Sequence, residues 1–207
     1  HWQGTWNDAG VNAQPAFLLQ GRLDYPDGSG ITLQSDSSWK VLAHTAFLET
    51  NATYFGGAGG RRNRAAIRFD SRREPLGWQA AGFDDSHWAA ATVVERPQFQ
   101  LFAQMAPAEH EQAQLKPLRL TRTNGAWLVD FGRCLDGWPK LTLRGNHPGD
   151  VVRLEYFQMS GERKPAGWDE YLCHGGTETW DADVGRHTSF QVLKITGYAG
   201  ALKAAEL

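Results

Sequence analysis

The chain has 207 residues and a net charge of -2, with 21 basic and 23 acidic residues well interspersed. This length holds one large or two small domains, and the lack of any basic stripe or run argues against a nucleic-acid partner. No apolar stretch approaches the roughly 20 residues that a membrane-spanning helix needs, so no membrane partner is expected.

The cysteine content excludes one kind of metal site. Cys134 and Cys173 are the only cysteines, and there is no CxxC pair or Cys/His cluster with zinc spacing. One disulfide and two free thiols remain open as alternatives for this pair. The compartment is not fixed by the sequence, and we favour a secreted or periplasmic protein.

The composition is biased toward aromatic residues, with 9 Trp, 5 Tyr and 10 Phe beside 23 Gly. Trp and Tyr present flat apolar faces that match the C–H faces of sugar rings, and their polar edges donate hydrogen bonds. The alternative is that they fill the core of a β-sandwich, and we assign most of them to that role.

In the first half, short β segments alternate with turn chemistry. Residues 17–25 and 31–34 flank Pro26-Asp27-Gly28-Ser29-Gly30, which predicts a hairpin, and residues 39–42 predict a further strand. The glycine-rich residues 56–60 run into Arg61-Arg62-Asn63-Arg64, which predicts an exposed loop of the kind that carries binding residues.

The next segments predict a turn and then a domain boundary. Asp and Ser residues in Phe83–Trp88 are typical of a side-chain-capped turn with the Trp packed beneath, so we interpret this segment as structural. Residues 104–117 are polar, contain two prolines and show little β pattern. They indicate a linker, with a domain boundary near residue 112.

The second half continues in the same style. Strands are predicted at 118–123 and 126–131 around Asn124-Gly125, a strong hairpin signal. Period-2 alternation predicts half-buried strands at 139–144, 151–157 and 189–196. The sequence therefore predicts an all-β protein of two antiparallel β-sandwiches, jelly-roll or galactose-binding-like, at residues 1–112 and 113–207.

Several segments, in this order, resemble the accessory sandwich region of the bacterial α-L-rhamnosidases, glycoside hydrolases of family 78. That region includes a rhamnose-binding-module-like sandwich ahead of an (α/α)6 barrel. The resemblance rests on DSSWKV (36–41), FDSRREPLGW (69–78), GFDDSHW (82–88), LVDFGRCLDGWPKLTLRG (128–145), GDVVRLEYFQM (149–159), GGTETWDADV (175–184) and SFQVLKITGYAG (189–200).

Three departures from the family pattern bear on function. The chain opens partway through the pattern of the first sandwich. Where the family usually has Gly-Glu-x-Tyr-Asp-Ala-Arg, residues 66–72 are AIRFDSR, so an acidic residue is missing. The family's Asp-Glu-Arg-Leu-Gly-Trp signature, which carries the general acid, does not occur in this chain. We therefore expect no catalysis by this chain alone, and a catalytic (α/α)6 barrel as its partner in the parent protein.

The resemblance implies a site for terminal L-rhamnose, held through a bound Ca²⁺, in an oligo- or polysaccharide. Calcium takes hard oxygen ligands, and the expected ligands are Asn7, Asp8 and Asn63. The expected carbohydrate contacts are the polar and aromatic loop residues Asn7, Asp8, Asn12, Asn63, Asp70, Arg72 and Trp78.

Each of these candidates also has a purely structural interpretation. The polar residues are equally typical of Asx-turns or of a salt bridge, such as Asp70 with Arg72 or Arg68. Residues 113–207 offer no obvious sugar platform and are expected to act as a spacer that docks the barrel. Two alternative functions stay open: a structural region that only orients a catalytic barrel, and a small free-standing sugar-active enzyme.

Overall fold

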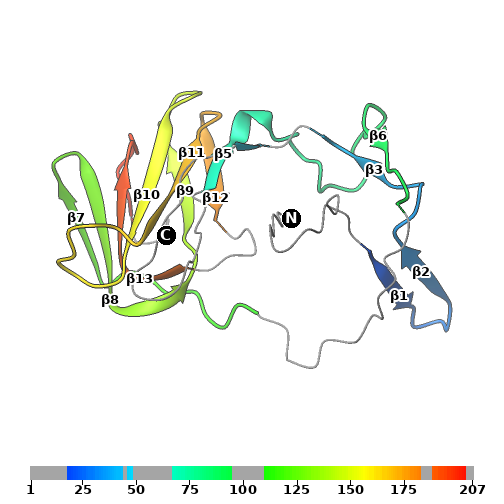
Figure 1. Cartoon of the computed structure of the whole chain (residues 1–207), viewed down its shortest axis with the longest axis horizontal. Helices are drawn as coiled ribbons and strands as arrows, with labels where there is room; N and C mark the ends of the chain where they lie inside the picture. Colours follow the sequence, from blue (N-terminus) through cyan, green and yellow to red (C-terminus); the bar gives the residue numbers. More distant parts are fainter. Residues whose placement is uncertain (1–17, 44–45, 49–66, 95–109, 183–187, 204–207) are drawn as a thin grey trace, which may run out of the picture. The chain divides into compact units, whose positions relative to one another are not determined.

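The computed structural model describes residues 18–43, 46–48, 67–94, 110–182 and 188–203. Over these residues the chain forms β1 to β13 and one short 3-10 helix, η1, with no α-helix (Figure 1). No helix in this part of the chain is long and apolar enough to cross a membrane. The chain divides into two compact units, unit 1 with His1–His44 and Leu76–His110, and unit 2 with Thr45–Pro75 and Glu111–Leu207.

The clearest element of unit 1 is the predicted hairpin, formed by β1 (Gln20–Asp24) and β2 (Gly30–Gln34) in antiparallel register. The Asp27 carboxylate accepts hydrogen bonds from the Ser29 amide at 2.9 Å and the Ser29 hydroxyl at 2.7 Å. This side-chain turn closes the loop and brings the two strands together.

A second short ladder in unit 1 joins β3 (Lys40–Val41) to β6 (Ala89–Ala90). The turn before β6 is capped as predicted, because Asp84 accepts a hydrogen bond from the Ser86 amide at 2.9 Å. Lys40 Nζ also donates to the Asp85 carboxylate at 2.7 Å. The polar residues of this segment are thus engaged in holding the turn against β3.

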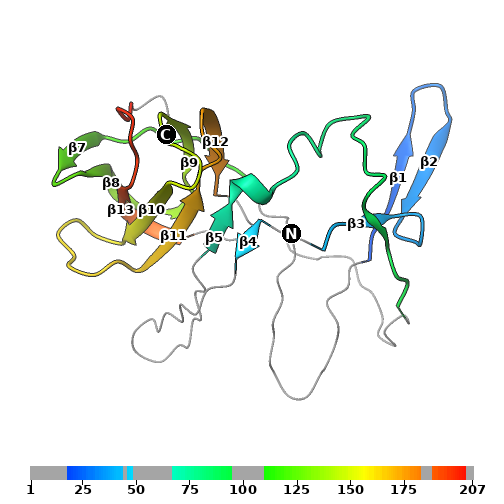
Figure 2. The ribbon, with the colours of Figure 1, turned by 90° about the horizontal axis from the view of Figure 1, so that it is seen from above.

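Unit 2 is built on a seven-stranded sheet. Its strands, in spatial order, are β4 (Phe47–Leu48), β5 (Ile67–Asp70), β11 (Gly167–Leu172), β10 (Val151–Phe157), β13 (Thr188–Thr196), β8 (Ala126–Gly137) and β7 (Arg119–Thr123). β12 (Thr177–Asp181) and β9 (Lys140–Arg144) form a second, two-stranded sheet. Figure 2 shows β4 and β5 continuing the sheet beyond β11.

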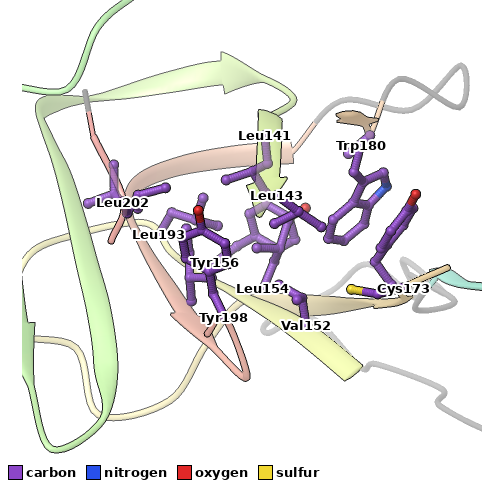
Figure 3. Close-up of a cluster of buried hydrophobic side chains, with 14 of the residues drawn as sticks. Leu141, Leu143, Val152, Leu154, Tyr156, Cys173, Trp180, Leu193, Tyr198 and Leu202 are labelled. Carbon is purple, nitrogen blue, oxygen red and sulfur yellow. The ribbon is translucent and has the colours of Figure 1, made fainter. Parts of the chain in front are cut away.

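The core of unit 2 arises from strand alternation. On β10, Val152, Leu154 and Tyr156 are buried while the residues between them are half-buried or exposed, as period-2 geometry requires. These side chains pack with Leu141 and Leu143 of β9 (Figure 3). Each fully buried aliphatic side chain contributes about 1.5–3 kcal/mol, so this cluster is the main stabilising element of unit 2.

The predicted all-β class is confirmed, and so is the hairpin at Asn124-Gly125, where both residues adopt the positive φ that such a turn requires. Two features were not predicted. β5 pairs with β11 in parallel, an exception to the antiparallel arrangement. In addition, β4, β5 and η1 precede residue 112 in the sequence but belong to unit 2.

Candidate functional site

A group of polar residues of unit 2 lies at one end of the large sheet. Because β5 and β11 are parallel, their carboxyl ends lie at the same edge, and the antiparallel β10 begins there. The 3-10 helix η1 (Ser71–Arg73) directly follows β5 at this edge. Residues of η1 and the residues next to it form what we call the η1 cluster, which comprises Asp70, Ser71, Arg72, Gly149, Tyr171 and Glu178.

Asp70 and Arg72 form a two-pronged ion pair within the η1 cluster. Arg72 Nε donates to Asp70 Oδ1 and Arg72 Nη2 donates to Asp70 Oδ2, both at 2.8 Å, and the Arg72 amide donates to Oδ1 at 3.2 Å. The hydrogen bonds from Arg72 lower the pKa of the buried Asp70 carboxyl below its ordinary value, although desolvation opposes them. Both carboxylate oxygens are therefore engaged, and the guanidinium is held in one orientation.

Glu178 is a buried carboxylate with a full set of donors. Its side chain is 2% exposed, and it accepts hydrogen bonds from the Tyr171 hydroxyl at 2.9 Å and the amides of His174 and Gly175 at 3.2 and 3.1 Å. The Ser71 hydroxyl lies 3.1 Å from Glu178 Oε2 and 2.8 Å from the Leu172 carbonyl oxygen. This network ties η1 to β11 and β12.

Burial is the main cause of the shifted pKa values of two neighbouring groups, Tyr171 and Cys173. Desolvation, reinforced by Glu178, raises the pKa of the Tyr171 hydroxyl far above its ordinary value. Desolvation, and after it the charge of Glu178, also raises the pKa of the buried Cys173 thiol to about 12. Neither group is a nucleophile near neutral pH.

Gly149 makes room for Arg72. A Cβ atom at position 149 would lie 3.0 Å from Arg72 Nη1, and Gly149 has a φ of +92°, which disfavours other residues. The Gly149 amide donates to the Cys173 carbonyl at 2.8 Å, which fixes the loop in place. The Arg72 side chain is nevertheless 44% exposed, and none of the described residues accepts a hydrogen bond from Nη1.

The structure brings together two of the seven predicted site residues. Asp70 and Arg72 form the salt bridge that was the structural alternative for them, and Arg68 instead pairs with Glu170 at 3.1 Å. Trp78 lies in unit 1 and is 40% exposed. The remaining predicted residues, Asn7, Asp8, Asn12 and Asn63, lie outside the described residues.

The calcium prediction is not addressed by the described part of the chain. All three expected ligands lie outside it, and within it no group of three or more His, Cys, Asp or Glu side chains is arranged to hold a metal ion. Both carboxylate oxygens of Asp70 accept hydrogen bonds from Arg72.

Sequence reasoning missed Ser71, Gly149, Tyr171 and Glu178 as parts of this cluster. Gly149 carried a usable signal, since it lies between the predicted strands at 139–144 and 151–157. Glu178 carried only a weak signal, because in the alternating segment TETWD it shares a face with the apolar Trp180, and both face inward. Only the packing of η1 against β12 gives it its role.

Comparison with known proteins gives the class of this molecule as a pair of β domains found in glycoside hydrolases. Residues 2–112 match the α-L-rhamnosidase N-terminal domain, and residues 120–207 match the bacterial α-L-rhamnosidase concanavalin-like domain. The chain belongs to the α-L-rhamnosidase family.

The individual relatives agree with this assignment. The chain is 27% identical to an α-L-rhamnosidase of Formosa agariphila and 26% identical to one of Streptomyces avermitilis, over 88% and 90% of this chain. It spans only 19% and 18% of their lengths. A solved α-L-rhamnosidase from Dictyoglumus thermophilum superposes with a TM-score of 0.69 at 26% identity, covering 91% of this chain and 21% of that one. An Aspergillus terreus α-L-rhamnosidase shares the fold at 22% identity, with a TM-score of 0.68.

Proposed function

We propose that this chain is a non-catalytic region of an α-L-rhamnosidase-like glycoside hydrolase and that it binds terminal L-rhamnose of an oligo- or polysaccharide. The observation that carries the proposal is that both halves of the chain match α-L-rhamnosidase domains. The half-exposed Arg72 guanidinium supports it, because a fixed, charged donor suits sugar hydroxyls. Trp78 would supply an apolar surface for the sugar ring.

A bound Ca²⁺ is part of this proposal. Asn7, Asp8 and Asn63 would hold the ion, and Asn12 would lie beside it in the site. These residues have the oxygen donors that calcium prefers. The ion would orient the ring hydroxyls of the sugar. Bond cleavage would be left to a catalytic (α/α)6 barrel in the parent protein.

A structural role is the second candidate, and a specific observation favours it. The carboxylates of Asp70 and Glu178 both have their hydrogen bonds satisfied inside unit 2. Under this alternative the η1 cluster only stabilises the sheet edge, and the region orients the barrel without binding sugar.

Titration calorimetry with L-rhamnose separates the two candidates. The proposal expects saturable binding at millimolar sugar or tighter, and weaker binding after chelation with EDTA. Binding that is insensitive to EDTA would remove calcium from the proposal. No heat of binding at millimolar sugar, with calcium present, would leave the structural role.

An activity assay tests whether the chain is a free-standing enzyme. The purified chain is expected to release no rhamnose from an aryl α-L-rhamnoside or a rhamnosylated oligosaccharide, because the acidic signature of the family is not in its sequence. Turnover that persists through further purification would establish catalysis by this chain.

A further inference from the structure

The Arg72 guanidinium combines a fixed position with hydrogen-bonding capacity that none of the described residues uses. Two of its five N–H groups are directed at Asp70, through Nε and Nη2. No described residue accepts from Nη1, and 44% of the side chain is exposed. A guanidinium fixed on one side and open on the other is a preorganised donor, since little rotational freedom is lost when a ligand binds.

The groups that fix Arg72 belong to unit 2. Asp70 ends β5 and is itself held by its amide, which donates to the Ala46 carbonyl at 2.7 Å. Ser71 contacts the buried Glu178 of β12 at 3.1 Å. Gly149, two residues before β10, leaves the space that Arg72 Nη1 occupies. Asp70 and Gly149 thus border the Arg72 side chain directly, whereas Glu178 holds Ser71, the residue before Arg72.

We infer that Arg72 is a sugar-contacting donor of this region, and that Asp70, Glu178 and Gly149 are positioning residues that hold it in place. This inference rests on the proposed function and deepens it. Asp70 is assigned a role through Arg72, because both its carboxylate oxygens accept hydrogen bonds from the Arg72 side chain. Glu178 and Gly149 lie within the concanavalin-like segment, so that segment controls binding by a residue of the N-terminal one.

Gly149 provides the sharpest variant, because the chain offers a matched control. Gly149→Ala imposes a positive-φ strain and also places a methyl group 3.0 Å from Arg72 Nη1. Gly145→Ala imposes a similar strain at a φ of +78°, but its methyl group meets nothing within 4 Å. The difference between the two variants isolates the displacement of Arg72 from the cost of the backbone conformation.

A second pair of variants tests the positioning role of Glu178. Glu178→Gln removes the carboxylate that anchors Ser71, whereas Glu155→Gln makes the same chemical change in an ion pair with Lys194 on the outer face of the sheet.

Arg72→Lys tests the sugar contact itself, because it keeps the positive charge but loses the planar guanidinium fork.

The experiment measures L-rhamnose affinity of the full chain by calorimetry, with near-UV circular dichroism to confirm that each variant is folded. Arg72→Lys and Gly149→Ala are expected to weaken binding by about tenfold or more, the effect of losing a hydrogen bond to a charged group. Glu178→Gln should weaken it in the same direction, and Gly145→Ala and Glu155→Gln should bind like the wild type.

The measurements distinguish a failure of this inference from a failure of the proposed function. Wild-type affinity in the Arg72→Lys chain overturns the inference and leaves the proposed function standing. Equal losses in Gly149→Ala and Gly145→Ala, or in Glu178→Gln and Glu155→Gln, overturn the positioning roles. If the wild-type chain binds no L-rhamnose, the proposed function and this assignment both fall.

Discussion

A buried carboxylate such as Glu178 is tolerated only when donors replace the water it has lost. Here two backbone amides and the Tyr171 hydroxyl do so, with the Ser71 hydroxyl adjacent. The charge-assisted bonds are stronger than neutral ones, and their geometry fixes η1 on the sheet edge. Removing one donor therefore costs more than the bond alone, because the carboxylate stays buried and under-satisfied.

Tyr171→Phe tests this cost. The ring keeps its stacking on Trp180, at a centroid distance of 5.0 Å, while the hydroxyl that donates to Glu178 is lost. We expect the free energy of unfolding to fall by about 1–3 kcal/mol in urea titrations. Tyr25→Phe, at an exposed tyrosine of unit 1, should change it by less than about 0.5 kcal/mol. Equal effects from both substitutions would contradict the role assigned to Glu178.

The two cysteines are free thiols in different surroundings, Cys134 exposed and Cys173 buried. Burial raises the pKa of Cys173 from its ordinary 9.0 to about 12, so its reactive thiolate is scarce at pH 8. A colorimetric thiol titration at pH 8 should therefore detect Cys134 alone in the native chain and both cysteines in urea. Two rapidly reacting thiols in the native chain would contradict this arrangement.

The same shift gives a pH dependence of stability. The folded state retains the Cys173 proton to a higher pH than the unfolded chain does, so this contribution is complete below about pH 9 and is lost as the pH rises toward 12. Cys173→Ala should flatten the alkaline loss of stability in urea titrations between these two values. A slope that is unchanged in the variant would rule out Cys173 as its source.

At the scale of elements, the sequence predicted what local patterns can encode. Alternation identified β9, β10 and β13, and Asn124-Gly125 identified the β7–β8 turn. β5 was not predicted as a strand, because four residues are too few to show a period and its partner β11 lies about 100 positions away. For the same reason, only two of the six residues of the η1 cluster were predicted, since Asp70 and Arg72 are close in sequence while Glu178 is not.

Asp169 of β11 anchors the first residue of β5, the strand that pairs with β11 in parallel. Its carboxylate accepts hydrogen bonds from the Ile67 amide at 2.8 Å and the Tyr156 hydroxyl at 2.7 Å. In Asp169→Ala the Ile67 amide loses its acceptor, and amide exchange in peptides covering Ile67–Asp70 should speed up relative to those covering Thr188–Thr196. Hydrogen-exchange mass spectrometry measures both peptides in one experiment. Equal acceleration in the two would show global destabilisation and contradict a local anchor.

At the scale of the whole molecule, the linear order of domains and the compact units differ. The predicted boundary near residue 112 coincides with the gap between the two family matches, whereas residues 45–75 cluster with the second half of the chain. Phe69 stacks on Tyr171 with a centroid distance of 5.7 Å. Part of the aromatic packing of the sheet is therefore supplied by a residue that precedes the domain boundary in the sequence. Composition marks linkers, but it carries no information on which sheet a short strand will join.

Truncation tests this organisation. A fragment of residues 113–207 lacks β4, β5 and η1 and should show weak near-UV circular dichroism and bind a hydrophobic dye, because it exposes the edge of β11 and one face of Tyr171. A fragment of residues 45–207 keeps every described strand of unit 2 and should unfold cooperatively. Cooperative unfolding of the shorter fragment at the same urea concentration would show that β4 and β5 are dispensable.

The parallel β5–β11 pair also has a consequence for synthesis on the ribosome. The Ile67 amide is made 102 residues before the carboxylate that receives it. At translation rates of about 5–20 residues per second, β5 waits about 5–20 s for its partner. Throughout that interval one edge of the strand is open to pairing with other nascent chains, which its charged residues Arg68 and Asp70 disfavour. We therefore expect the yield of correctly assembled protein to depend on the rate of elongation, which equilibrium unfolding does not measure.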